Sequence, residues 1–152
     1  MNTGAIGIGS NIGDLKKNIS LALKLLKTEG IELIRQAESM KTTPLNCPEK
    51  TPDFLNTAII CRFSCSPEKL LKICKKIETQ MGRPIMHAKN SSRIIDLDIL
   101  LIKDISIQSK MLTVPHPEML KREFVLKPLF EIAPDWNIPG TSLTIEDAMQ
   151  KL

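Results

Sequence analysis

Apolar residues recur along the chain with two different periods, and these periods predict alternating strands and helices. Helical spacing follows Asp14 as far as Gly30 and continues through residues 66–82. Together with the strand-like runs, this gives the order β-α-β-β-α-β, the pattern of a ferredoxin-like α+β sandwich. The strand-like runs are residues 5–10, 31–42, 54–64 and 93–102.

The two helices carry recognisable start and stop residues. Asp14 is placed to cap the first helix and Gly30 to end it. Ser66 is placed to cap the second helix, with Pro67 in its first turn and Gly82 at its end. Both helices are therefore expected with well-defined boundaries.

The last third of the chain predicts a C-terminal helical extension. Residues 105–109 are expected to form a hairpin arm against the strand at 93–102. Residues 122–134 predict a short helix that is broken near Pro128, and residues 144–152 predict a small closing helix. With no linker or repeat in view, residues 1–152 are expected to form a single domain.

Composition narrows the function classes. The net charge is only +4, and the chain has four Phe, one Trp and no Tyr. A stacking platform for single-stranded nucleic acid is therefore not expected, whereas an anionic small molecule suits this charge. No apolar run approaches the roughly 18 residues of a membrane span. The four cysteines lack CxxC spacing, which favours reduced thiols in a cytoplasmic protein.

Two aspartates interrupt the apolar run at residues 93–102. On a strand, Asp96 and Asp98 share one face, with their Cα atoms roughly 6.6 Å apart. Two carboxylates at this spacing repel each other unless a cation lies between them, and Mg²⁺ favours a few carboxylates together with phosphate oxygens. The alternatives are a solvated face, or pairing with Arg93 and nearby lysines.

Two further polar residues have more than one interpretation. Glu78 lies at the margin of the apolar face of the second helix, which is compatible with a solvated residue or a site residue. His116 lies between Pro115 and Pro117 in a rigid turn, where a structural hydrogen bond and a ligand contact are both open.

The motifs together resemble the 6-hydroxymethyl-7,8-dihydropterin pyrophosphokinase family. The resemblance covers nearly the whole chain, and RIIDLDIL followed by VPHP and REFVLKPL is its most specific part. The matching segments, in order, are GIGSNIGD (7–14), TTPL (42–45), PDFLNTA (52–58), IETQMGR (77–83), SRIIDLDILLI (92–102), LTVPHPEM (112–119) and REFVLKPLFEIAPD (122–135).

The resemblance implies transfer of diphosphate from ATP to a reduced pterin in folate biosynthesis, by a monomer that binds small molecules and neither nucleic acid nor membranes. It implies that Asp96 and Asp98 hold two Mg²⁺ ions, and that Arg83 and Arg93 are catalytic loop arginines over the phosphates. The implied ATP-binding residues are Glu78, Arg83, Ile99, Thr113, His116 and Arg122. The implied pterin-binding residues are Thr43, Pro44, Leu45, Phe54, Asn56 and Phe124.

The residue types suit these roles. A flat pterin fits between Phe54 and Phe124, and Asn56 offers both donors and an acceptor to its edge. The chain departs from the family where many members carry Trp-Gly-Pro and residues 90–92 are Asn-Ser-Ser. Two alternatives remain: another metal-dependent phosphotransferase that uses the same aspartates, or a ferredoxin-like binding module without catalysis.

Overall fold

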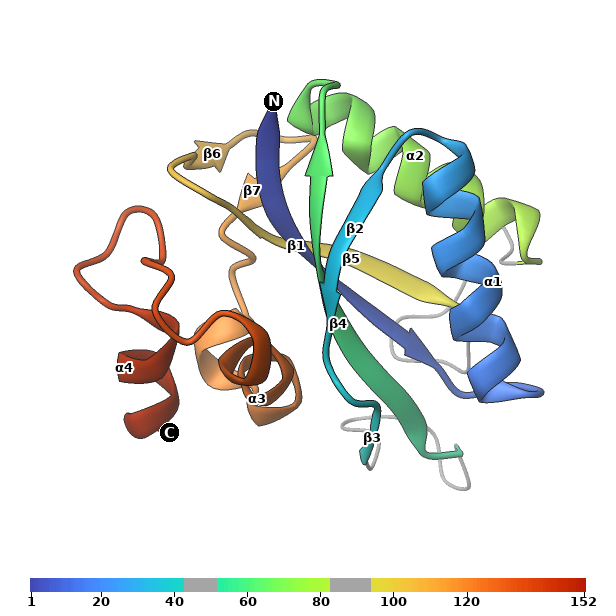
Figure 1. The fold of residues 1–152 in the computed structure, drawn as a ribbon. Coiled ribbons are helices and arrows are strands. Elements are labelled where there is room, and N and C mark those ends of the chain that lie inside the picture. Colours follow the sequence, from blue (N-terminus) through green and yellow to red (C-terminus); the bar gives the residue numbers. More distant parts are fainter. Residues whose placement is uncertain (43–51, 83–93) are drawn as a thin grey trace.

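The computed structural model describes residues 1–42, 52–82 and 94–152. One twisted sheet lies at its centre, with helices packed on both faces (Figure 1). The elements are β1 Asn2–Ser10, α1 Leu15–Thr28, β2 Glu32–Gln36, β3 Met40–Thr42, β4 Phe54–Phe63, α2 Pro67–Gln80, β5 Asp96–Ile102, β6 Ile107–Gln108, β7 Thr113–Val114, the 3₁₀ helix η1 Met119–Lys121, α3 Glu123–Ile132 and α4 Ile145–Gln150.

The central sheet has the strand order β2-β4-β1-β5, and every neighbouring pair is antiparallel. The short strand β3 pairs with the beginning of β4. In chain order, helices connect the first long strand to the second and the third to the fourth, whereas the short strand β3 comes between the second and the third. This topology confirms the ferredoxin-like α+β prediction.

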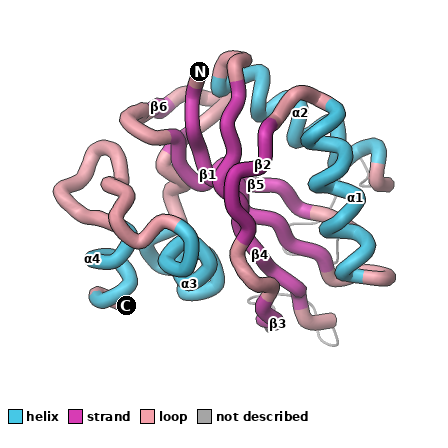
Figure 2. Tube along the Cα trace, viewed as in Figure 1, coloured by secondary structure: helices cyan, strands magenta, loops and turns pink. Residues whose placement is uncertain are grey.

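Helices α1 and α2 lie together on one face of the sheet (Figure 2). The apolar stripe of α1, with Ile19 and Leu26, is buried in the core cluster that lies between these helices and the sheet. The predicted caps are confirmed. Asp14 accepts a hydrogen bond from Lys17 N–H, and Ser66 accepts one from Lys69 N–H.

Helices α3 and α4 lie on the opposite face, over a second core cluster that includes Leu126, Leu129 and Ile132. The predicted break near Pro128 is wrong, because α3 continues through this residue. Proline removes one hydrogen bond within the helix. Burial of each large apolar side chain on this face contributes about 1.5–3 kcal/mol, which offsets that loss.

Two other strand predictions need correction. The run at 31–42 forms two strands rather than one: β2 ends at Gln36, Ala37 N–H donates to Ala58 O, and β3 begins at Met40. Residues 105–109 do not form a full hairpin arm against β5. Ile105 makes only an isolated bridge to Ile102, and Ile107–Gln108 pairs with Thr113–Val114.

The strand β5 also departs from simple alternation. The register with β1 shifts between Ala5 and Ile6, so that Leu100 has no direct partner. As a result Leu101 is buried on the α3 side, although simple alternation would place it on the same face as Leu97 and Ile99. Among the helices in the described ranges, none has the length and apolar character needed to cross a membrane.

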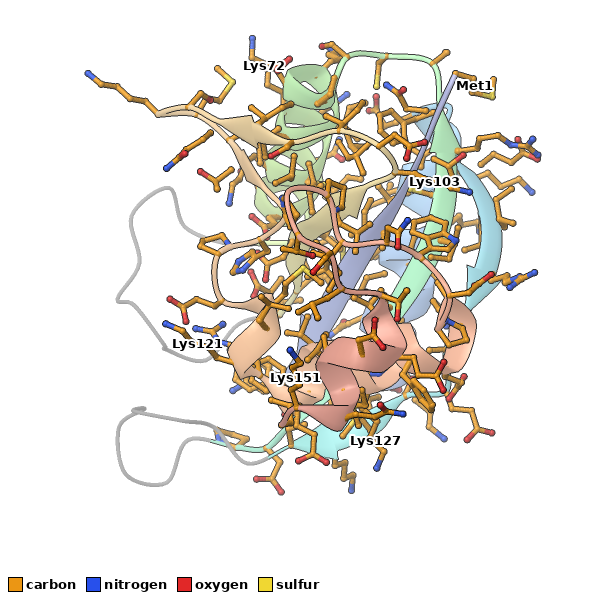
Figure 3. The ribbon with its side chains drawn as sticks, turned by 90° about the vertical axis from the view of Figure 1, so that its left-hand side faces the viewer. Met1, Lys72, Lys103, Lys121, Lys127 and Lys151 are labelled. Carbon is orange, nitrogen blue, oxygen red and sulfur yellow. The ribbon has the colours of Figure 1, made fainter. Side chains whose placement is uncertain are left out.

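The turn after β5 is tied to the C-terminal extension. Lys103, labelled in Figure 3, directly follows β5. Its ammonium group lies 5.6 Å from the centre of the Trp136 ring. This cation–π contact joins the end of the sheet to the segment between α3 and α4. The far end of the same sheet face carries polar residues instead.

Candidate functional site

Polar residues replace apolar ones on the α3 face of the sheet near the end of β1. Asn56 of β4 is paired with Gly9 of β1, and Gly9 is paired with Asp96 of β5. Partners in register project to the same face of a sheet. Asn56, Gly9 and Asp96 therefore form a row across three strands, here called the polar row. Asp98 is paired with Gly7 on the same face.

Asp96 and Asp98 are both half-buried at the start of β5. Their position on the face opposite α2 confirms that the two carboxylates share one side of the strand, while Leu97 is buried on the other side. Within residues 1–42, 52–82 and 94–152, no three His, Cys, Asp or Glu side chains gather closely enough to hold a metal ion. Two carboxylates suit Mg²⁺, which takes its remaining ligands from phosphate and water.

Glu78 is not a solvated surface residue, because its side chain is only 2% exposed. It reaches from α2 to the backbone of β5, where its carboxylate accepts a hydrogen bond of 2.8 Å from Leu97 N–H. Lys75 lies 3.5 Å from its other oxygen. Glu78 thus supports the peptide that lies between the two aspartates, on the side of the strand away from β1.

Asn56 has a defined orientation. Its Nδ2 group donates to the hydroxyl of Thr42 at 2.5 Å, and its Oδ1 atom lies toward Gly9. Phe54 lies two residues earlier on the same strand face and is half-buried, as is Asn56. The structure therefore brings together two of the residues expected to bind a pterin, on the same sheet face as Asp96 and separated from it by β1.

His116 is held close to β5 by its backbone, since its N–H donates to Leu100 O at 2.7 Å. Its Nδ1 atom accepts a hydrogen bond of 3.1 Å from Glu118 N–H. The neutral ring therefore carries its proton on Nε2. Burial, followed by the positive charge of Arg122, lowers the pKa of His116 below its ordinary value, while Glu118 and Asp96 act in the opposite direction.

Arg122 and Phe124 stand at the start of α3. The Arg122 guanidinium lies over the Phe124 ring, 5.6 Å from its centre. The resemblance implies that Arg122 binds the nucleotide and that Phe124 binds the pterin. The contact, together with the electrostatic interaction between Arg122 and His116, shows that the two predicted binding regions adjoin each other here.

Of the other predicted residues, only Ile99 and Thr113 lie within the described part of the chain. Ile99 is buried in the core beneath α1 and α2, so any ligand contact would be left to its backbone. Thr113 begins β7 and is half-buried. The remaining predicted residues lie outside the described residues: Thr43, Pro44, Leu45, Arg83 and Arg93, as does the Asn90–Ser92 departure.

A buried polar cluster at the end of β1 was not predicted to take part in the site. Ser10 donates to Ile94 O at 2.5 Å and accepts from Asn18 Nδ2, and Asn11 donates to Pro52 O at 3.2 Å. Ser10 is 0% exposed and Asn11 is 3% exposed. These bonds fix the approaches to β5 and β4, two residues before Asp96 and Phe54 respectively. The sequence signal that could have indicated this cluster is the pair of polar residues, Ser10 and Asn11, at the end of an apolar run.

Comparisons with known proteins agree on one family. The family model described as 7,8-dihydro-6-hydroxymethylpterin-pyrophosphokinase (HPPK) matches residues 5–134. The folic acid synthesis protein fol1 of Schizosaccharomyces pombe is 39% identical over 97% of this chain. The 2-amino-4-hydroxy-6-hydroxymethyldihydropteridine pyrophosphokinase of Haemophilus influenzae is 36% identical over 96% of this chain.

The matched lengths differ among these proteins. The chain spans 91% of the Haemophilus protein but only 20% of fol1. A crystal structure of wild-type Plasmodium falciparum HPPK-DHPS with pteroate superposes with a TM-score of 0.75, covering 99% of this chain and 42% of that one. At 16% sequence identity, this likeness concerns the fold.

Proposed function

The chain belongs to the 7,8-dihydro-6-hydroxymethylpterin-pyrophosphokinase family, and we propose that it transfers diphosphate from ATP to 6-hydroxymethyl-7,8-dihydropterin in folate biosynthesis. The products are AMP and the pterin pyrophosphate. The observation that carries this proposal is the polar row, because Asn56, which suits a heterocycle edge, and Asp96, which suits a cation, lie on the two strands that flank β1, each paired with Gly9.

Asp96 and Asp98 are the proposed ligands of two Mg²⁺ ions. Their shared face and their half-buried position support this role, since carboxylates beside a phosphate chain are the usual protein ligands of Mg²⁺. When bound, the ions neutralise charge on the phosphates and stabilise the attacking and leaving oxygens. Arg83 and Arg93 are proposed to add positive charge to the transferring group.

The nucleotide is proposed to bind along β5 and the segment that leads to α3. His116 supports this, because its Nε2–H is available as a neutral donor while Nδ1 is occupied by Glu118 N–H. Arg122 supplies a positive charge beside it. Thr113 and the backbone of Ile99 complete the proposed nucleotide contacts among the described residues, with Glu78 acting from beneath the strand.

The pterin is proposed to bind at the other end of the polar row. Phe54 and Phe124 provide apolar surfaces for a flat ring, and Asn56 provides hydrogen bonds to its edge. Thr43, Pro44 and Leu45 are proposed to complete this pocket. The fixed amide orientation of Asn56 supports the role, because a preorganised group loses less entropy when the substrate binds.

In the proposed reaction the pterin hydroxyl oxygen forms a bond to the β-phosphorus of ATP. The bond from the β-phosphorus to the oxygen that bridges to the α-phosphate breaks, AMP leaves, and the hydroxyl proton passes to water. The residues of this chain act by holding the two substrates in line, which is the main protein contribution to phosphoryl transfer. We propose that the domain acts as a monomer in the cytoplasm and binds neither nucleic acid nor membranes.

The test is AMP formation from ATP and Mg²⁺, with and without 6-hydroxymethyl-7,8-dihydropterin. Wild type is expected to form AMP only when the pterin is present, and Asp98→Ala is expected to form almost none. Asp135→Ala is the matched control, because it makes the same chemical change at an exposed position after α3. Pterin-independent AMP formation, or full activity of Asp98→Ala, would overturn the proposal.

A further inference from the structure

The polar row contains one residue without a side chain. Gly9 lies between Asn56 and Asp96, with its strand partners on both sides. A Cβ atom built on Gly9 would lie 2.8 Å from Asn56 Oδ1, and 3.5 Å from the nearest ring carbon of Phe54. The first distance is shorter than real Cβ contacts allow, so a side chain here would displace the Asn56 carboxamide.

The need for glycine at this position is steric rather than conformational. The glycines with a positive φ are Gly13, Gly30, Gly82 and Gly140, and Gly9 is not among them. Alanine therefore fits the backbone of β1 at residue 9, and the crowding comes from Asn56 alone at this distance. The backbone gives no reason of its own for the missing side chain.

The Asn56 carboxamide is held from its other side as well. Its Nδ2 group donates to Thr42, which is paired with Phe54 at the edge of the sheet. The amide therefore lies between the Thr42 hydroxyl and the bare Cα of Gly9. Moving it away from Gly9 also breaks or bends the bond to Thr42, because a hydrogen bond tolerates little change in angle.

We propose that Gly9 is a specificity-determining residue, whose missing side chain keeps the Asn56 carboxamide in the orientation that recognises the donor and acceptor edge of the pterin. This inference rests on the proposed function. Gly9 contacts no reacting atom in the proposal. It acts through Asn56, and it keeps the surface between the pterin edge and Asp96 free of side-chain atoms.

The test is a double-mutant cycle with Gly9→Ala, Asn56→Ala and the double variant. The readouts are the KM for 6-hydroxymethyl-7,8-dihydropterin and the KM for ATP, both from AMP formation. Gly9→Ala is expected to raise the pterin KM about tenfold, the effect of losing one well-oriented hydrogen bond. The ATP KM is expected to stay within about twofold of wild type.

The cycle separates this role from a general structural one. In the Asn56→Ala background the clashing oxygen is gone, so adding Gly9→Ala is expected to change the pterin KM by less than about twofold. Gly7→Ala is the matched control, because the atoms nearest to its Cβ belong to the Leu100 side chain, at 3.3 Å, and not to Asn56. It is expected to alter the free energy of unfolding without raising the pterin KM.

A second variant tests the inference if Gly9→Ala folds poorly. Thr42→Val removes the acceptor of the Asn56 bond, and it is expected to raise the pterin KM while leaving the ATP KM unchanged. An active wild type with additive Gly9→Ala and Asn56→Ala effects, or with no effect of Thr42→Val, would overturn this inference alone. A wild type without pterin-dependent AMP formation would overturn both the inference and the proposed function.

Discussion

Replacing Glu78 tests whether the buried carboxylate acts through the backbone of β5. The informative pair is Glu78→Gln and Glu78→Leu, because the glutamine side-chain oxygen still accepts a hydrogen bond from Leu97 N–H and leucine accepts none. The 2.8 Å bond and the 2% exposure of Glu78 mean that water does not replace a lost acceptor easily. The difference between the two variants in the free energy of unfolding and in activity then reports on this contact.

The expected magnitudes follow from the kind of hydrogen bond that each variant retains. A bond to a charged acceptor contributes about 1.5–3 kcal/mol, and a neutral one about 0.5–1.5 kcal/mol. Glu78→Leu is therefore expected to lower the free energy of unfolding by about 1.5–3 kcal/mol, and Glu78→Gln by about 1 kcal/mol. Lys75 contributes little, since its side chain is 59% exposed and the ion pair measures 3.5 Å.

Urea denaturation and Mg²⁺ titrations of AMP formation measure the two effects. Glu78→Leu is expected to need more Mg²⁺ for half-maximal activity, because the peptide between Asp96 and Asp98 loses its support, whereas Glu78→Gln stays close to wild type. Lys75→Met is the control for the ion pair. Equal losses in the glutamine and leucine variants, matched by Lys75→Met, would refute the backbone role and assign the effect to the charge of Glu78.

Three further predictions follow from other parts of the structure. The pKa of His116 is lower in the folded protein than in the unfolded chain, so as the pH falls the unfolded chain is protonated first. The free energy of unfolding is therefore expected to fall as the pH drops from about 7 through 6.5. His116→Gln is expected to flatten this part of a stability–pH curve. Ile77→Ala, at 0% exposure, is expected to lower the free energy of unfolding by about 2–5 kcal/mol, against less than about 0.5 kcal/mol for Leu21→Ala at 45% exposure. Burial raises the pKa of Cys61 to about 12 and also raises the pKa of Cys74, so iodoacetamide at pH 8 is expected to leave both thiols unlabelled in the folded protein, as peptide mass spectrometry can check.

Much of the fold was predictable because the local signals agree with one another. The periodicity of α1 and α2, together with Asp14 and Ser66 as caps, places both helices within one or two residues of their observed bounds. The errors occur where tertiary packing outweighs local preference. Pro128 stays within α3 because the apolar face around it is buried against the sheet.

The candidate site was predictable only in part. The shared face of Asp96 and Asp98 follows from strand geometry alone. The polar row does not, because the register that aligns Asn56 and Asp96 on either side of Gly9 depends on three strands far apart in the sequence. The burial of Glu78 could not be predicted from the sequence either. Helical periodicity places Glu78 at the margin of the apolar face, but it does not show that the Leu97 N–H group of β5 needs a hydrogen-bond acceptor there.

The edge position of β5 explains why charged residues occur within an apolar run. Within the described residues, β5 pairs with β1 on one side only, so its other side presents backbone N–H groups that need acceptors. The helix α2 buries Leu97 and supplies Glu78 as the acceptor for its N–H. The opposite face of β5, on the α3 side of the sheet, carries Asp96 and Asp98. Alternating residues therefore meet two requirements: Leu97 fills the core on one face, and Asp96 and Asp98 supply the charge that the proposed chemistry needs on the other. Glu78 holds the peptide between the two aspartates.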